Sequence, residues 1–161
     1  MSSRSYSDVQ TVLQTILATF AYPLPVVISL ILDSQFGLPK LLIPFGRLIG
    51  LLLIPVGSIL ILLATIDLIR FGNGTPHPFA PTMNFVDKGL YSIVRHPIYL
   101  GWIVSLVGSI AYFQSFLMLE STAIIIVFIF FYARYEEGKL VERFGKRYAK
   151  YLKKVPGFLP C

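Results

Sequence analysis

Four long apolar runs, separated by short polar segments, constrain this chain more than any other feature. They cover Val12–Leu32, Arg47–Ile69, Ile98–Phe113 and Phe116–Tyr135. A helix of about 20 apolar residues spans the hydrocarbon core of a bilayer, and the third run is shorter than that. Only 14% of the residues are charged and the mean hydropathy is +0.73, whereas soluble domains are about 25% charged. The sequence therefore predicts an all-α integral membrane protein, one domain over residues 1–161, with about four transmembrane helices.

Glycines and prolines inside these runs predict where helices bend and where they pack closely. Pro23 and Pro25 lie in the first run and are expected to kink it, since neighbouring helices can satisfy the carbonyls that proline frees. Gly50, Pro55 and Gly57 lie in the second run. Small residues let helix backbones approach closely in a membrane, so the second run is expected to pack tightly against a neighbour.

The segments between the runs predict turns and one long loop. Residues 33–46 are expected to form a turn with an interfacial piece, and entry of residues 36–46 into the membrane would make five spans instead of four. The stretch Arg70–Pro97 is polar and rich in proline, which favours an extended loop over a helix. Gln114 and Ser115 predict a tight turn between the third and fourth runs.

Basic residues gather on one predicted side of the membrane, and the net charge is +6. Four spans place the Arg70–Pro97 loop and both termini on the same side. The other side carries only Lys40 and Arg47, which leaves twelve of the 14 Lys and Arg residues on the loop side. Positive residues concentrate on the cytoplasmic side, so we expect the cytoplasmic membrane with both termini in the cytoplasm. Membrane lipid headgroups explain the basic residues more simply than nucleic acid does, and the polar start MSSRSYSD does not resemble a signal peptide.

Side chains that could bind a polar ligand converge where the third helix begins and the fourth ends, because a tight hairpin joins them. They are Arg95, His96, Tyr99, Arg134, Glu136 and Glu137. Arginine and histidine can hold a carboxylate, and glutamate can accept from ribose hydroxyls or an ammonium group. A tyrosine ring offers a flat face to an adenine or a sulfonium. Pro97 suits the first turn of a helix, whose N-terminus favours anions. From these residues alone, a ligand site and a salt-bridged collar fit equally well.

After the fourth run, Leu140, Phe144, Tyr148 and Tyr151 recur at spacings that form one face of a helix. Lysines and arginines fill the other face, so an amphipathic C-terminal helix lying on anionic lipid is expected. That interpretation does not explain the adjacent glutamates at positions 136 and 137. Their negative charge opposes the same lipid surface.

Two sequence blocks resemble the isoprenylcysteine carboxyl methyltransferase family and its relatives, the membrane phospholipid methyltransferases. The blocks are GLYSIVRHPIYLG (residues 89–101) and EEGKLVERFGKRYAKYLKKVP (residues 136–156). The upstream GTPHPFAP is similar to a proline-rich loop of bacterial members. The resemblance covers about residues 70–160, and the two blocks at this spacing across a helical hairpin are specific.

The resemblance implies a methyltransferase that binds S-adenosylmethionine in a pocket at the cytoplasmic face, closed by the C-terminal helix. The cofactor would touch His96, Tyr99 and one or both of Glu136 and Glu137. The full set predicted to bind it is Tyr91, Arg95, His96, Tyr99, Glu136, Glu137, Leu140 and Tyr148. The predicted catalytic residues are Arg134, which would orient an anionic acceptor, and Glu137. The acceptor would be a lipophilic small molecule or a prenylated one, such as a prenyl-cysteine carboxylate, entering sideways from the bilayer.

The sequence departs from the prenyl-cysteine enzymes at the position of their substrate arginine. Tyr132 stands one turn before the glutamates, with Arg134 two residues on. Phospholipid amine N-methylation, small-thiol S-methylation and a non-catalytic role in membrane assembly therefore stay open. A transport subunit is disfavoured, because the span centres carry hydroxyls and no charge.

The remaining polar residues predict no further chemistry. His77 has no second ligand nearby, so we expect no metal and assign it a structural or lid role. Cys161 is the only cysteine, which rules out an internal disulfide. Asp67 and Arg70, one turn apart, are expected to form an ion pair.

Overall fold

The computed structural model describes residues 23–74 and 82–158, and within them the regular structure is helical. Five α-helices and one 3₁₀ turn follow in the order α2 (Pro23–Phe36), α3 (Gly46–Gly72), η1 (Gly89–Ser92), α4 (Pro97–Phe113), α5 (Phe116–Phe144) and α6 (Lys146–Lys154). One isolated bridge, between Lys40 and Ser115, lies outside the helices. The expectation of an all-α fold is confirmed for this part of the chain.

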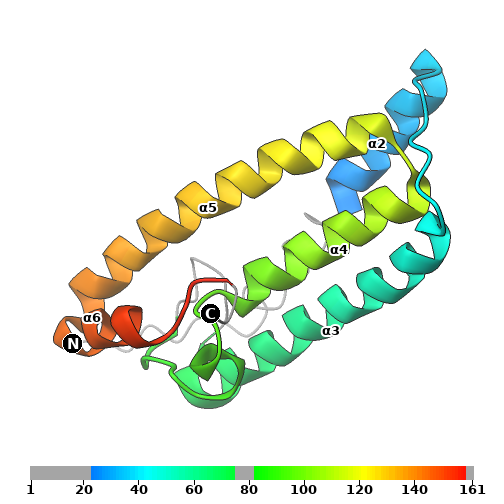
Figure 1. Ribbon diagram of the computed structural model, residues 1–161. Helices are drawn as coiled ribbons and strands as arrows, with labels where there is room; N and C mark the ends of the chain where they lie inside the picture. Colours follow the sequence, from blue (N-terminus) through cyan, green and yellow to red (C-terminus); the bar gives the residue numbers. More distant parts are fainter. Residues whose placement is uncertain (1–22, 75–81, 159–161) are drawn as a thin grey trace, which may run out of the picture.

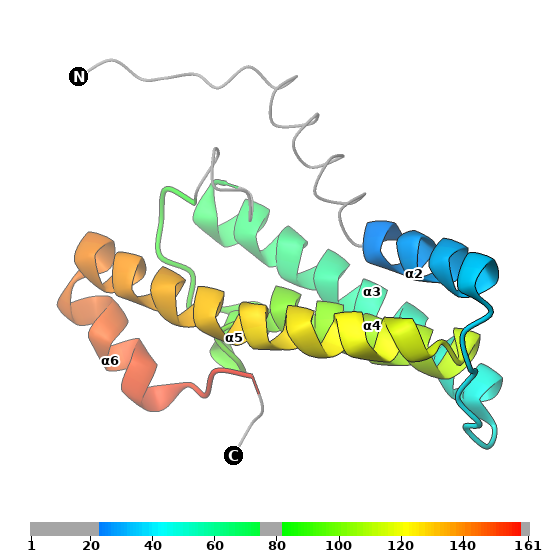
Figure 2. The same ribbon diagram turned by 90° about the horizontal axis from the view of Figure 1, so that it is seen from above.

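Three long helices run along the molecule, with α4 antiparallel to both α3 and α5 (Figure 1). α2 packs against the first half of α5, where the Oγ atoms of Ser29 and Ser121 lie 3.4 Å apart. Figures 1 and 2 show the chain after α6 turning back towards the start of α4. This reversal brings the end of the described chain to the residues predicted to bind a ligand.

Two of the helices, α3 and α5, are long and apolar enough to cross a membrane. α4 has 17 residues, a length of about 25 Å at 1.5 Å per residue. The segment Leu24–Phe36 is also apolar but shorter. Residues 12–22 of the first predicted run lie outside the described residues, and α2 continues four residues past its predicted end at Leu32. Pro23 and Pro25 lie in the first turn of α2, where the described chain begins, so the kink expected there stays a prediction.

Glycines bring α3 and α4 into backbone contact, as expected for the second run. A Cβ atom on Gly50 would lie 2.6 Å from the carbonyl oxygen of Gly108, and one on Gly57 would lie 2.5 Å from that of Gly101. No larger side chain fits at such distances, so the glycines determine how closely the two helices approach. The opposite face of α3 exposes leucines such as Leu52, which is 62% exposed.

The hairpin between α4 and α5 closes at Gln114 and Ser115, as predicted. Gln114 adopts the left-handed conformation with φ 54°, which ends α4. The Ser115 hydroxyl accepts a hydrogen bond from the backbone N–H of Met118 (2.9 Å) and caps α5. The hairpin therefore places the start of α4 beside the end of α5.

The C-terminal helices differ from the pattern of the apolar runs. α5 does not end near Tyr135 but continues to Phe144, and a break at Gly145 (φ 60°) separates it from α6. The amphipathic segment is thus divided between two helices. Its apolar face packs on Phe85 from the loop before α4, so protein covers much of the surface that was expected to lie on lipid.

The expected ion pair between Asp67 and Arg70 does not form within the described chain. Asp67 Oδ2 instead accepts a hydrogen bond from the backbone N–H of Leu90 (2.8 Å). Gly89 sits against the same carboxylate with φ 61°, where a Cβ atom would collide with it. Asp67 therefore pins the η1 turn to the end of α3, because a buried backbone N–H needs an acceptor.

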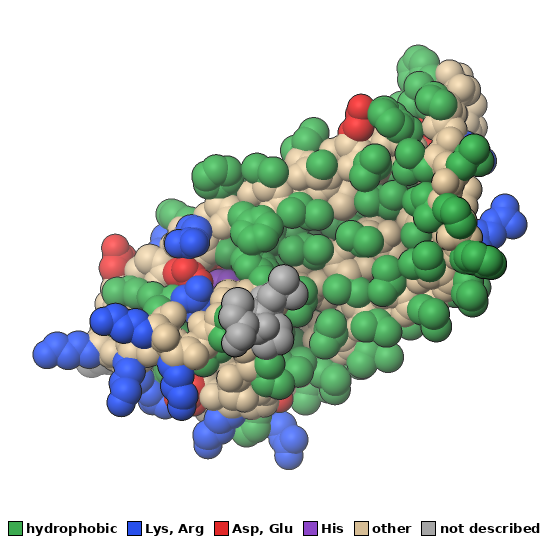
Figure 3. Space-filling view, in the orientation of Figure 1, with side chains coloured by type: hydrophobic (Ala, Val, Ile, Leu, Met, Phe, Trp, Pro, Cys, Tyr) green, Lys and Arg blue, Asp and Glu red, His purple; other side chains and the backbone are tan. Residues whose placement is uncertain are grey.

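Charge is distributed unevenly over the surface. Figure 3 shows an apolar body and a cluster of lysines and arginines at the end that carries α6. Lys40 and Arg47 belong to the opposite end, where α3 begins. The structure therefore gathers the basic residues of the loop and the last helices at one end, as the charge count predicted.

Candidate ligand site where α4 begins and α5 ends

The site begins at the first turn of α4. Pro97 occupies the first turn and His96 is the residue before it, a position in which proline's missing N–H costs nothing. His96 is 6% exposed and points its ring at α5. The α5 residues that face inwards recur at helical spacing and end at the site: Met118, Thr122, Ile129, Ala133 and Glu137. The helical periodicity of α5 thus places Glu137 beside His96.

Glu137 is the inner of the two adjacent glutamates. Its Oε1 lies 3.0 Å from His96 Nε2 and 3.3 Å from Arg95 Nη2. The side chain of Glu137 is 11% exposed, and those of Arg95 and His96 are 15% and 5% exposed. A buried carboxylate is stable only when it is paired, so these three side chains form one charge cluster.

Glu136 is the outer glutamate and is more accessible, with its side chain 39% exposed. The Tyr99 hydroxyl, one turn along α4 from His96, donates to Glu136 Oε2 (2.8 Å). His96 Nδ1 is 3.9 Å from the same oxygen. The two neighbouring carboxylates therefore differ in environment: one is enclosed by the cluster, and the other can meet a ligand.

Arg95 joins this cluster to the chain that follows α6. Its Nη1 donates to the carbonyl of Leu152 (3.2 Å), and its backbone N–H donates to the carbonyl of Pro156 (2.9 Å). The His96 backbone N–H donates to the carbonyl of Gly157 (3.1 Å). Residues 156–158, named here the return segment, thus lie across the start of α4.

Two aromatic rings stack on His96. The rings of Tyr99 and Phe158 each lie 5.4 Å from it, tilted by 19° and 29°. Phe158 also contacts Phe130 of α5 at 4.7 Å, and Tyr132 meets Tyr99 edge-on at 6.3 Å. Flat rings of this kind can bind a planar base or a cation.

The other predicted site residues lie at varying distances from the cluster. Arg134 is exposed, and no contact in the described chain joins it to the glutamates. Leu140 and Tyr148 belong to a hydrophobic cluster with Tyr151, Val155 and Phe85, beside the charged group rather than in it. The carbonyl of Tyr91 accepts from the Tyr151 hydroxyl (2.5 Å). The proposed roles of these residues stay predictions.

Burial raises the pKa of three tyrosines at this end of the protein. For Tyr91 the negative charge of Glu136 adds to the effect of burial, and for Tyr148 the charge of Glu137 does the same. Burial is also the main cause for Tyr151, although nearby Arg95 works in the opposite direction. All three therefore remain neutral phenols at physiological pH.

These tyrosines predict a loss of stability at alkaline pH. A pKa that is raised on folding means that the phenols contribute fully below the unfolded value of about 10, and that stability falls as the pH rises above it. Thermal unfolding in detergent between about pH 8 and 11 should show the melting temperature falling above pH 10. Tyr148→Phe should make that fall shallower, and an unchanged slope in this variant would contradict the assignment.

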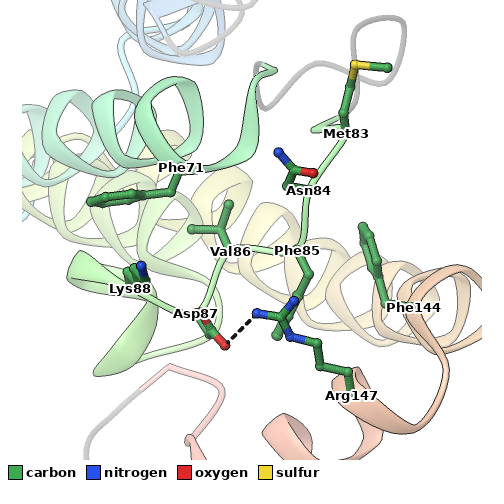
Figure 4. Close-up of a pocket in the computed structure, with 9 residues that line it drawn as sticks. All are labelled: Phe71, Met83, Asn84, Phe85, Val86, Asp87, Lys88, Phe144 and Arg147. Atoms are coloured by element: carbon green, nitrogen blue, oxygen red, sulfur yellow. Dashed lines mark hydrogen bonds and ion pairs between the residues drawn. The ribbon is translucent and has the colours of Figure 1, made fainter.

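Two cavities open near the site, and neither is lined by His96, Tyr99, Glu136 or Glu137. The first, of about 410 Å³, lies between Phe71, the loop before α4 and Phe144 (Figure 4). The second, of about 280 Å³, lies on the other side of Phe85, against α6. Arg147 borders both and pairs with Asp87 at 3.3 Å.

Several residues of this region were not identified from the sequence. Phe130 resembles any other apolar residue of a membrane span, and Phe85 lies in a loop that was expected to be extended. Phe158 and the carbonyls of Pro156 and Gly157 reach the site only because the chain reverses after α6. The carbonyl of Leu152 reaches it from α6 itself. The VP pair at the end of the second block was the one available signal, since proline after a helix predicts that the chain changes direction there.

Comparison with known proteins finds similarity to a methyltransferase family and to proteins named as methyltransferases. A family model described as phospholipid methyltransferase matches residues 45–147. Protein-S-isoprenylcysteine O-methyltransferase B of Arabidopsis thaliana is 38% identical over 80 residues, 47% of this chain and 39% of that protein. The Xenopus laevis protein-S-isoprenylcysteine O-methyltransferase is 31% identical over 115 residues, 70% of this chain and 40% of that protein.

A relative with a different named activity also matches. Methanethiol S-methyltransferase 1 of Bradyrhizobium diazoefficiens is 35% identical over 71 residues, 44% of this chain and 24% of that protein. The chain spans about two fifths of the length of the isoprenylcysteine enzymes it matches. With the two apolar helices, these matches identify a membrane protein. The family match covers more than half of the chain and includes His96 and both glutamates, so the chain belongs to the phospholipid methyltransferase family.

Proposed function

We propose that this protein is a membrane methyltransferase that uses S-adenosylmethionine and acts on a lipid-like acceptor, such as a prenyl-cysteine carboxylate. The observation that carries the proposal is the pairing of an enclosed glutamate with an accessible one. Glu137 is held by His96 and Arg95, and Glu136 faces outwards beside Tyr99. This arrangement stands at the end of helices that are otherwise apolar.

The residues present fit a sulfonium nucleoside. The carboxylate of Glu136 can attract a positive charge or accept hydrogen bonds from ribose hydroxyls. Tyr99 and His96 present flat faces to a planar base or to a sulfonium. Glu137, Arg95 and His96 hold one another, which keeps these faces in position before a ligand arrives.

When bound, S-adenosylmethionine supplies a methyl group that is already activated on sulfur. The protein therefore has to align the acceptor with that group and keep water away. A carboxylate or thiolate acceptor needs no base. An amine would have to lose a proton, and Glu136 is the accessible carboxylate that could take it.

A route for a lipophilic acceptor runs along α5. Phe128, Phe131 and Tyr135 are 66%, 74% and 58% exposed, and they lead along the helix to Glu136. In a bilayer, an acyl or prenyl chain can lie against these rings while its polar end reaches the glutamate. Arg134, exposed on the same helix, would orient an anionic acceptor. We place this end of the protein, with both termini, in the cytoplasm.

Ligand binding tests the proposal directly. Calorimetry on the detergent-purified protein should detect S-adenosylmethionine and its demethylated product. Glu136→Gln should weaken binding about tenfold or more, because a hydrogen bond to a charged group contributes about 1.5–3 kcal/mol. Glu142→Gln makes the same change at an exposed position of α5 and should leave the affinity unchanged.

The outcomes separate the alternatives. Absence of binding by a folded wild-type protein would refute the methyltransferase proposal and favour the non-catalytic membrane role. Binding without turnover of a prenyl-cysteine acceptor would direct the search to phospholipid amines and small thiols. The methanethiol S-methyltransferase among the relatives is the observation that favours small thiols as alternative acceptors.

A further inference from the structure

The ring of Phe158 fills the place where a flat ligand would lie against His96. His96 stacks with the rings of Tyr99 and Phe158, and Phe158 belongs to the return segment. Phe130 also contacts Phe158, with ring centroids 4.7 Å apart and ring planes tilted by 56°. Phe158 thus touches both His96 and Phe130, and the place that its ring occupies beside them is named here the slot.

The return segment is held in a way that allows it to leave. Within the described chain, two hydrogen bonds hold it, from the backbone N–H groups of Arg95 and His96 to the carbonyls of residues 156 and 157. The segment is not helical and has no regular structure of its own. Val155, immediately before it, is 7% exposed and anchored in the hydrophobic cluster. Movement of residues 156–158 therefore needs no rearrangement of α6.

We propose that Phe158 occupies the subsite of a planar heteroaromatic base, and that the methyl donor displaces the return segment when it binds. The inference rests on the proposed function, because the base is that of S-adenosylmethionine.

The ligand can replace each contact that the return segment makes with the start of α4. A purine ring can stack on His96 and contact Phe130 as the phenyl ring does. When residues 156 and 157 leave, the N–H groups of Arg95 and His96 lose their acceptors, and buried N–H groups need replacements. Ring nitrogens of a purine and ribose oxygens are acceptors of the required kind. The ligand can therefore take over both the stacking and the hydrogen bonds of the segment that it displaces.

The inference predicts that removing the ring of Phe158 strengthens ligand binding instead of weakening it. In the wild-type protein the donor competes with Phe158, so its apparent affinity is reduced by the fraction of molecules in which the slot is open. Phe158→Ala should therefore bind S-adenosylhomocysteine about three- to tenfold more tightly by calorimetry. Phe36→Ala, which removes a 70% exposed ring from the end of α2, is the control and should bind as the wild type does.

A second measurement does not depend on a truncated side chain. A single 4-fluorophenylalanine in place of Phe158 gives one fluorine resonance. Saturating S-adenosylhomocysteine should move that resonance to the position seen in the unfolded protein, since the ring becomes solvated.

Each result decides the question. Weaker or unchanged binding by Phe158→Ala, or a resonance that stays at its buried position in the complex, would overturn the inference and leave the proposed function standing. In that case Phe158 is a permanent wall of the site. Failure of both wild type and variant to bind would refute the proposed function and the inference together.

Discussion

Replacing Glu137 by alanine is expected to lower the free energy of unfolding by about 3 kcal/mol. The substitution leaves Arg95 and His96 buried, with side chains 15% and 5% exposed, and without their shared carboxylate. Removing one partner of a buried ion pair costs far more than removing an exposed pair, since the remaining charge stays uncompensated. Thermal unfolding in detergent, followed by circular dichroism, measures the loss.

Glu136→Ala is the matched comparison, because it deletes the neighbouring carboxylate. The side chain of Glu136 is 39% exposed, and its hydrogen bond comes from Tyr99. We expect its melting temperature to stay within a few degrees of the wild type, while binding of S-adenosylmethionine falls sharply. If the two variants were equally unstable, the division into an enclosed and an accessible glutamate would be wrong.

Gly57→Ala should destabilise the protein by about 3 kcal/mol, which is the upper end for overpacking. The new Cβ atom would lie 2.5 Å from the carbonyl oxygen of Gly101 and 2.7 Å from the backbone nitrogen of Ser105. These atoms belong to the helix backbone of α4 and cannot rotate away. Relief therefore requires α3 and α4 to move apart along their contact.

Gly138→Ala provides the control for Gly57→Ala. Gly138 lies inside α5 at an exposed position, and a Cβ atom there would meet nothing within 4 Å. Alanine in a helix interior is favoured over glycine by about 0.5–1 kcal/mol, so this variant should be slightly more stable than the wild type. A stable Gly57→Ala protein would contradict the close packing of α3 on α4.

Much of the architecture could be read from local patterns. The ends of α4 and the turn at Gln114 and Ser115 were predicted correctly, because a proline in a first turn and polar residues between apolar runs act on neighbouring backbone. The same turn made it clear that His96 and the two glutamates meet. Helical spacing alone, however, did not distinguish Glu136 from Glu137, since adjacent residues differ by only 100° around a helix.

The boundaries that failed depend on contacts between distant segments. α5 extends to Phe144, nine residues past its predicted end, and its apolar residues near that end pack on Phe85. Asp67 was expected to pair with Arg70 within its own helix, yet the backbone N–H of Leu90 offers a closer partner from the loop. Propensity and periodicity describe a segment by itself, and neither predicts which remote group will supply a hydrogen bond or an apolar cover.

By itself the sequence determined that this protein is helical, that its basic residues share one end, and which residues meet where α4 begins and α5 ends. Those properties follow from hydropathy, charge and turn chemistry, which act over a few residues. Only the tertiary structure decided that Glu137 is enclosed by Arg95 and His96, and that Phe158 lies on His96. The physical reason is packing between distant segments: Glu137 meets His96 across the hairpin of α4 and α5, 41 positions apart. Phe158 reaches His96 because the chain reverses after α6.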